Sequence, residues 1–228
     1  MWRATVLSLF PEMFPGTLGF SLSGKALKNG IWSLNAINIR DYADNQNGKV
    51  DDVPFGGGPG MVIKPDVLDR ALNSVADEKG PRIYLSPRGK FFDQEFAKDL
   101  SKEKGAVFIC GRYEGVDERF LIKNDIIEVS VGDYILSGGE VGAQIILDAT
   151  IRLLPNVIGN SEGLVDESFE NNLLEYPLYT QPRNWESMNV PDVLLSGDHK
   201  KIKDWKIKQA EEITKFNRPD LWSKYMKS

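Results

Sequence analysis

Strand-like and helix-like segments alternate along the first 155 residues, and this alternation is the strongest constraint on the fold. Short apolar runs such as 82–86 (RIYLS) and 106–110 (AVFIC) have the length and composition of buried strands. Between them lie segments with apolar residues at helical spacing, such as the one that begins at Pro65. Such alternation indicates an α/β fold with a mostly parallel sheet and helices on its faces.

The same pattern gives the remaining elements. We expect further strands at 2–9, 31–39 and 125–130, and further helices at 21–29, 93–104, 117–123 and 140–154. Near the C-terminus a helix begins at Ser196 or Asp198, and Pro219 separates it from a last short helix. The sequence therefore predicts an α/β domain over 1–157, a flexible linker over 158–175 and a small helical domain over 176–228.

Two rare residue types limit the chemistry. The 228 residues include one cysteine, Cys110, and one histidine, His199. A zinc cluster of His and Cys is excluded by count, and a Ser-His-Asp site would depend on His199 alone. Cys110 ends an apolar run and is expected to be a buried strand residue. Any chemistry is therefore expected to use carboxylates, arginines and backbone donors.

Composition also bears on location and partners. A single cysteine cannot form an intramolecular disulfide and fits a reducing compartment, so we expect a cytoplasmic protein. No apolar run approaches the roughly 20 residues that span a bilayer. The formal net charge of −5 argues against a general coat for nucleic acid, although it leaves room for a local basic groove.

Four glycine-rich loops are the candidate ligand sites: 51–60 (DDVPFGGGPG), 85–92, 110–120 and 130–140. The last three follow predicted strands directly, and open parallel sheets bind ligands at the carboxyl ends of their strands. The usual nucleotide motifs, GxxxxGK[ST] and a GxGxxG between strand and helix, are absent. The pattern alone predicts a bound small molecule with adenosine-like or carbonyl-rich needs.

Five segments resemble the family of bacterial tRNA (guanine-N1)-methyltransferases, which belongs to the knotted SPOUT superfamily. They are DDVPFGGGPGM (51–61), LSPRG (85–89), GRYEGVDER (111–119), VGDYILSGGE (131–140) and VPDVLLSGDH (190–199). The resemblance implies a deep trefoil knot, which spacing and periodicity do not predict. It also implies a homodimer with its active sites at the interface, and methyl transfer from S-adenosylmethionine to N1 of guanine 37 in tRNA.

The resemblance further implies that three loops hold S-adenosylmethionine, largely through main-chain groups. The residues carried over are Tyr84, Leu85, Ser86, Pro87, Gly111, Tyr113, Glu114, Ser130, Val131, Gly132, Asp133, Tyr134, Ile135, Leu136, Gly138 and Gly139. A magnesium ion is expected near Glu114, with no protein ligands assigned to it.

Methyl transfer to guanine N1 needs a base and a cation. The base removes the N1 proton as the nitrogen attacks, and a guanidinium stabilises the negative charge that builds on O6. By family position the guanidinium belongs to Arg152. The family has Asp-Ser-Phe where this chain has Asp166-Glu167-Ser168-Phe169, so the base is Glu167 or Asp166. We favour Glu167, which occupies the Asp position when counted from Arg152.

RNA contacts are expected from two regions. The resemblance assigns 51–60 to the anticodon stem-loop, and we expect substrate contacts from Asp51, Asp52, Phe55, Gly57, Gly58 and Arg112. The C-terminal domain is expected to bind tRNA, with its lysines (Lys200, Lys201, Lys203, Lys206 and Lys208) against phosphates.

Two alternatives stay open. The first is a non-catalytic SPOUT module that binds RNA or a nucleotide, and the change at Glu167 is the feature that favours it. The second is a SPOUT methyltransferase with another RNA target, such as a ribose 2′-OH. The segment 51–60 and the C-terminal helical region argue against the second, because they resemble the guanine-N1 enzymes specifically.

Overall fold

The computed structural model describes residues 1–44, 47–159 and 167–227. The chain divides into two units, Met1–Gly159 and Asn160–Ser228. The predicted domain and linker boundaries stay predictions, and part of the predicted linker, 160–166, lies outside the described residues.

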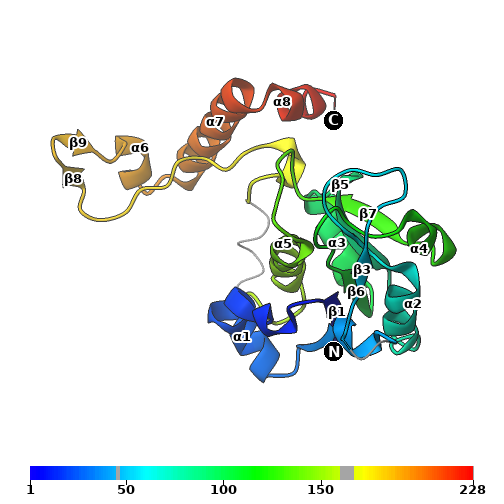
Figure 1. The fold of residues 1–228 in the computed structure, drawn as a ribbon. Coiled ribbons are helices and arrows are strands. Elements are labelled where there is room, and N and C mark those ends of the chain that lie inside the picture. The colour runs from blue at the N-terminus through cyan, green and yellow to red at the C-terminus, as the bar shows by residue number, and fades with distance from the viewer. Residues whose placement is uncertain (45–46, 160–166, 228) are drawn as a thin grey trace. The chain divides into compact units, whose positions relative to one another are not determined.

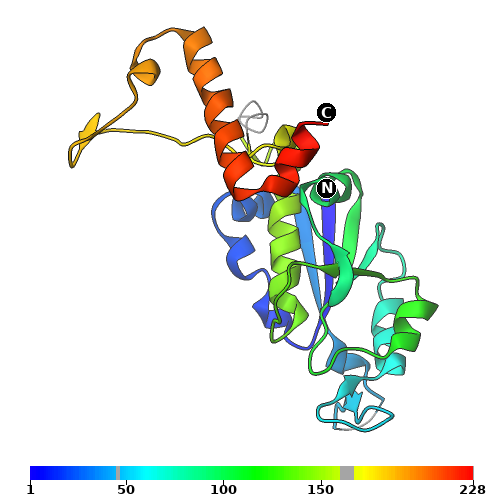
Figure 2. The same cartoon turned by 90° about the horizontal axis from the view of Figure 1, so that it is seen from above.

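A parallel sheet forms the centre of the first unit (Figures 1 and 2). Within the described residues its order is β2-β1-β6-β5-β7, and all neighbouring strands are parallel. The strands are β1 (Trp2–Ser8), β2 (Trp32–Asn38), β5 (Arg82–Phe91), β6 (Gly105–Ile109) and β7 (Ile127–Ser130). The predicted α/β fold with a mostly parallel sheet is confirmed. The trefoil knot stays a prediction.

Helices cover both faces of the sheet. The helices on one face are α1 (Ser21–Lys28), α3 (Gln94–Lys102) and α5 (Gly139–Ile151), and those on the other are α2 (Pro65–Asn73) and α4 (Glu118–Lys123). Figure 1 shows α2 and α4 together on the side away from α5. Successive residues of β6 point to opposite faces, so Phe108 packs in the α5 core and Ile109 in the α2 core. The near-continuous apolar runs of the sequence reflect this burial on two sides.

Strand β5 is longer than the sequence predicts. It was expected to end at residue 86, but it continues to Phe91 after an irregularity between Leu85 and Lys90. Pro87 lies inside this irregularity, where its missing N–H removes no ladder hydrogen bond. Beyond it Lys90 pairs with Val129 and Phe91 with Ser130, so the strand returns to the same neighbour.

The glycine-rich segment 51–60 starts in a small antiparallel sheet that the sequence did not predict. Strand β3 (Asp51–Asp52) pairs with β4 (Val62–Ile63), and the residues between them form a loop. The short helices of the first unit are η1 (Pro11–Met13), η2 (Gly16–Gly19) and η3 (Ile39–Tyr42).

The second unit is mainly helical. Its elements are η5 (Glu170–Asn172), β8 (Asn184–Trp185), β9 (Met188–Asn189), α6 (Asp192–Leu195), α7 (His199–Asn217) and α8 (Pro219–Tyr225). Asp198, one of the two predicted caps, begins α7, because its carboxylate accepts hydrogen bonds from the backbone N–H groups of Lys200 and Lys201, both at 3.1 Å. The β8–β9 hairpin and α6 were not predicted. Among the described helices, none has the length and apolar composition of a membrane span.

Candidate functional site

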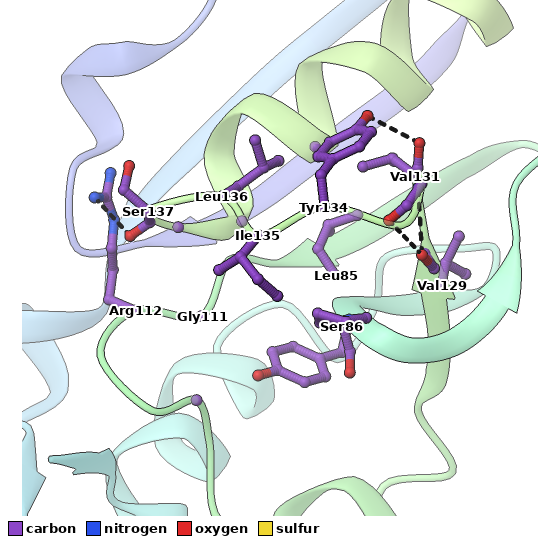
Figure 3. A pocket seen from close by; sticks show the side chains of 18 of the residues that line it. Leu85, Ser86, Gly111, Arg112, Val129, Val131, Tyr134, Ile135, Leu136 and Ser137 are labelled. Atoms are coloured by element: carbon purple, nitrogen blue, oxygen red, sulfur yellow. Dashed lines mark hydrogen bonds between the residues drawn. The ribbon is translucent and has the colours of Figure 1, made fainter. Parts of the chain in front are cut away.

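A pocket of about 280 Å³ lies where β5, β6 and β7 lead into their loops (Figure 3). Its walls come from three stretches of chain and from the start of α5. The lining residues are Tyr84–Pro87, Gly111–Gly115, Val129–Gly132, Tyr134–Gly139 and Gly142. We call 84–87, 111–115 and 130–139 the first, second and third pocket loops. All residues predicted for the cofactor line this pocket except Asp133.

The Tyr84 side chain packs closely against the second pocket loop. A Cβ atom added to Gly111 or Gly115 would stand 2.9 Å from the Tyr84 hydroxyl oxygen, so only glycine lets the loop lie this close. Gly115 also has a φ of +115°, which other residues rarely adopt. Burial, and after it the charge of Glu128, raises the pKa of the Tyr84 hydroxyl, so this group stays neutral at physiological pH.

The third pocket loop is held by its own hydrogen bonds and by the second loop. The Tyr134 hydroxyl donates to the carbonyl oxygen of Val131 at 2.9 Å, as Figure 3 shows. The N–H of Gly139 donates to the carbonyl oxygen of Gly111, also at 2.9 Å. The two loops therefore meet through the backbone at the start of α5.

Arg112 and Glu140 form a buried ion pair beside this junction. Arg112 Nε lies 2.9 Å from Glu140 Oε2, and only 19% and 1% of the two side chains are exposed. The other carboxylate oxygen, Oε1, accepts a hydrogen bond of 2.6 Å from the Ser8 hydroxyl. Sequence reasoning missed Glu140. The available signal was a carboxylate in the first turn of a helix that follows a glycine-rich loop.

Cys110 is buried as predicted, although it lies one residue beyond β6 rather than in the strand. Burial raises the pKa of its thiol well above the usual value, and the charge of Glu140 adds to this effect. The thiolate is therefore disfavoured, and Cys110 is a packing residue rather than a nucleophile.

The residues that directly follow the glycine-rich segment, 61–63, are attached to the second pocket loop. The N–H of Glu114 donates to the carbonyl oxygen of Met61 at 2.9 Å, and the N–H of Ile63 donates to that of Gly115 at 3.0 Å. Phe55 is 99% exposed. The segment therefore forms an exposed loop whose C-terminal end is anchored beside the pocket.

Of the other five residues predicted for the substrate, four lie in this loop or in the strand before it, and the fifth, Arg112, lies in the second pocket loop. Gly57 and Gly58 have φ values of +79° and +111°, and no atom of the described residues lies within 4 Å of an added Cβ, so glycine is needed there for conformation rather than for room. Asp51 and Asp52 form β3. A hydrogen bond from Lys49, whose Nζ lies 3.0 Å from Asp52 Oδ2, lowers the pKa of Asp52.

The predicted catalytic residues belong to different units. Arg152 is the C-cap of α5 in the first unit. Glu167 lies in the second unit, where it lines a groove of about 580 Å³ with His199, Lys203 and Lys206 of α7. Asp166, the alternative base, lies outside the described residues. In the described parts of the chain, no group of three or more His, Cys, Asp or Glu side chains gathers to hold a metal ion.

Comparison with known proteins decides the family. The model of the family described as tRNA (Guanine-1)-methyltransferase TrmD matches residues 2–224. The chain belongs to this family. The prediction of a tRNA (guanine-N1)-methyltransferase that uses S-adenosylmethionine is thereby confirmed.

Relatives with the name tRNA (guanine-N(1)-)-methyltransferase match along the whole chain. The protein of Pelagibacter ubique is 54% identical over 228 residues, which cover 100% of both chains. That of Rhodospirillum rubrum is 53% identical over 224 residues, or 98% of this chain and 94% of the relative. That of Brucella ovis is 52% identical over 227 residues, or 100% and 94%.

Proposed function

We propose that the pocket of the first unit binds S-adenosylmethionine and that the protein transfers its methyl group to N1 of guanine 37 in tRNA. One observation carries the proposal: the three loops that resemble the family's cofactor loops converge on a single pocket. They are far apart in sequence, and only the parallel sheet brings their strand ends together.

The pocket suits an adenosyl group in size and chemistry. Its volume, about 280 Å³, is close to the lower end of the roughly 300–1,000 Å³ of small-molecule sites. Glycines at 111, 115, 138 and 139 line the pocket without side chains, so a ligand such as an adenosyl group can approach the backbone closely there. Leu85, Val131 and Ile135 offer apolar surface to the flat base.

The methyl donor supplies an activated sulfonium, so the protein must orient the acceptor, remove one proton and stabilise one charge. We assign Arg152 to the charge that builds on guanine O6. Glu167, or Asp166 in its place, would take the N1 proton. A glutamate has basicity similar to that of aspartate and one more methylene group, so its backbone must sit slightly farther from the guanine.

We assign the exposed part of 51–60 to the RNA. The ring of Phe55 is available to stack on an unpaired base, and Asp51 and Asp52 can accept hydrogen bonds from base edges. Gly57 and Gly58 would give the backbone close approach. Arg112, which the sequence grouped with these residues, contacts Glu140 and Ser137 instead, and these contacts support a different role.

Three further features belong to the proposal. The enzyme acts as a homodimer with each active site at the interface, a magnesium ion assists near Glu114, and the protein works in the cytoplasm. Family resemblance supports the first two. The single cysteine supports the third.

The test uses methyl-labelled S-adenosylmethionine and tRNA transcripts with guanine or adenine at position 37. Label at N1 of the guanine transcript alone is the expected result. Binding of both ligands without transfer would favour the non-catalytic module, and label on ribose would favour another RNA target. Arg152→Ala should abolish transfer with cofactor binding retained.

Separate variants test which carboxylate is the catalytic base and whether 51–60 binds RNA. Glu167→Ala should remove most activity and Asp166→Ala little, and near-normal turnover of the Glu167→Ala protein would transfer the role to Asp166. Gly57→Ala should weaken tRNA binding and leave S-adenosylmethionine binding unchanged. The reverse pattern would refute the assignment of 51–60 to RNA.

A further inference from the structure

We propose that Glu140 is a positioning residue that fixes the Arg112 guanidinium, and that Arg112 in turn locks the second pocket loop to the third. This inference rests on the proposed role of the pocket as the S-adenosylmethionine site. It assigns Arg112 to the construction of that site rather than to RNA.

The Arg112 guanidinium contacts residues of the third pocket loop and of the N-terminal region. Nη1 of Arg112 donates to the carbonyl oxygen of Ser137 at 3.2 Å, a contact drawn in Figure 3. Nη2 lies 3.4 Å from the sulfur of Met13. Cζ of the guanidinium lies 4.5 Å from the centroid of the Phe10 ring. Arg112 therefore reaches from the second pocket loop to the third, and each of its three guanidinium nitrogens lies beside an atom of the protein.

Glu140 restricts the orientation of the Arg112 guanidinium. Its carboxylate is buried at the first turn of α5, with Ser8 on one oxygen and Arg112 on the other. Ser8 is itself fixed, since its hydroxyl oxygen accepts a hydrogen bond from the N–H of Phe10. The end of β1, the start of α5 and the second pocket loop thus meet at one carboxylate.

The fit around the guanidinium supports the same role. A Cβ atom on Gly138 would collide with Nε and the neighbouring carbons of Arg112. The backbone of the third pocket loop therefore lies directly against the arginine.

Energetics favour a geometric role over a stabilising one. A buried ion pair often adds little net stability compared with apolar residues of similar volume, because both charges lose their hydration. Removing one partner is costly, because the other charge is then buried without compensation. What the pair supplies here is a fixed orientation of Arg112 at the edge of the pocket.

The experiment measures cofactor affinity and stability separately in the full-length protein. Isothermal titration calorimetry gives the Kd for S-adenosylmethionine and for S-adenosylhomocysteine, and thermal unfolding gives Tm. The variants are Glu140→Gln, Arg112→Lys, Arg112→Met and the double variant Arg112→Met with Glu140→Gln. Arg3→Met is the matched control, since Arg3 pairs with Glu78 at 3.1 Å on a part of the first unit away from the pocket.

Cofactor Kd should rise in each variant of the pair by roughly tenfold, the change in affinity expected when about one hydrogen bond of the site is lost. Arg112→Lys should keep its Tm, because the charge opposite Glu140 remains, yet lose affinity, because one ammonium cannot also hold Ser137. The double variant should recover Tm relative to Arg112→Met without recovering affinity. The control should keep both Kd values.

Two results would overturn the inference. A Kd within twofold of wild type in folded Glu140→Gln and Arg112→Lys proteins would show that the pair does not position the pocket. A Kd that follows Tm across all variants would show a purely structural role. Both results leave the proposed function intact, whereas failure of the wild-type protein to bind either ligand would overturn the pocket assignment itself.

Discussion

At Gly139 the third pocket loop is joined to the second by a backbone hydrogen bond to Gly111. A Cβ atom there would stand 2.9 Å from Cys110 Cα and 3.1 Å from the Gly111 nitrogen, and backbone atoms cannot move aside as a flexible side chain can. Gly139→Ala should therefore push the loops apart and lower the free energy of unfolding by about 1–3 kcal/mol. We also expect the Kd for S-adenosylmethionine to rise roughly tenfold, because the displaced loops are no longer preorganised for the ligand.

Gly159→Ala is the control for this substitution, because in the described part of the chain no atom lies within 4 Å of the added Cβ, and the residue needs no positive φ. It should change neither quantity, as calorimetry and denaturant titration can show. Equal Kd values for the two variants would mean that the Gly139–Gly111 contact is not part of the cofactor site.

Asp69 makes the stability of the first unit depend on pH. Hydrogen bonds from Lys123, at 2.7 Å, and then Asn124 lower the pKa of the Asp69 carboxyl and connect α2 to α4. Asp69→Asn should cost about 0.5–1 kcal/mol at pH 7. Because the folded pKa is the lower one, this difference is complete above the unfolded value of about 4 and disappears as pH falls through the folded pKa.

Urea titrations of both proteins between pH 2 and 7 measure the effect. Asp99→Asn removes an exposed carboxylate that pairs with Lys102 within the single helix α3 and should have a smaller effect. A wild-type advantage that grows as the solution becomes more acidic would contradict the direction of the Asp69 shift.

Residues of the pocket could be predicted to the extent that they stand in continuous motifs. GRYEGVDER and VGDYILSGGE each supply several lining residues in order, so the resemblance located them. The contact between Ser8 and Glu140 joins residues 132 positions apart, and no local pattern marks it. The role of Arg112 could not be predicted for the same reason, because its partners come from two other stretches of chain, 10–13 and 137–140.

At the scale of elements, α7 depends on a single cap. The Asp198 carboxylate accepts from two backbone N–H groups that the helix itself leaves without partners. Asp198→Ala should destabilise the start of α7 by about 1 kcal/mol, whereas Asp198→Asn should retain most of the cap. Hydrogen exchange at the amides of Lys200 and Lys201 reports the change directly. Unaltered exchange in the alanine variant would show that packing, not the cap, holds this end.

The main strands and helices could be predicted because each is long and has one clear period. Helix α2 begins at Pro65 as expected, and β6 is the apolar run around Phe108. The short pairs β3–β4 and β8–β9 have two residues in each strand, too few to show any period. The extension of β5 depends on its renewed pairing with β7, a tertiary contact that overrides the local effect of Pro87.

At the scale of the whole molecule, the proposal divides the work between the two units, and hydrogen–deuterium exchange can test this division. S-adenosylmethionine should slow exchange in 84–87, 111–115 and 130–139 and should raise Tm, since it binds only the folded state. Without RNA, α7 and α8 should keep their ligand-free rates. An anticodon stem-loop should slow exchange at 51–60 and at the lysines of α7.

S-adenosylhomocysteine is the control, because it carries the same adenosyl group without the transferable methyl. It should protect the same three loops. Protection of α7 by either small ligand in the absence of RNA would contradict this division between the units.

Two backbone hydrogen bonds connect the second pocket loop to residues 61–63, which directly follow the segment assigned to RNA. The coupling free energy between two binding sites is reciprocal: each ligand changes the affinity for the other by the same factor. If an anticodon stem-loop orders 51–60 and so raises the affinity for S-adenosylmethionine, then S-adenosylmethionine must raise the affinity for that RNA by the same factor. The enzyme would then hold each ligand best when the other is present, and the methyl donor would be bound most firmly when an acceptor is in place.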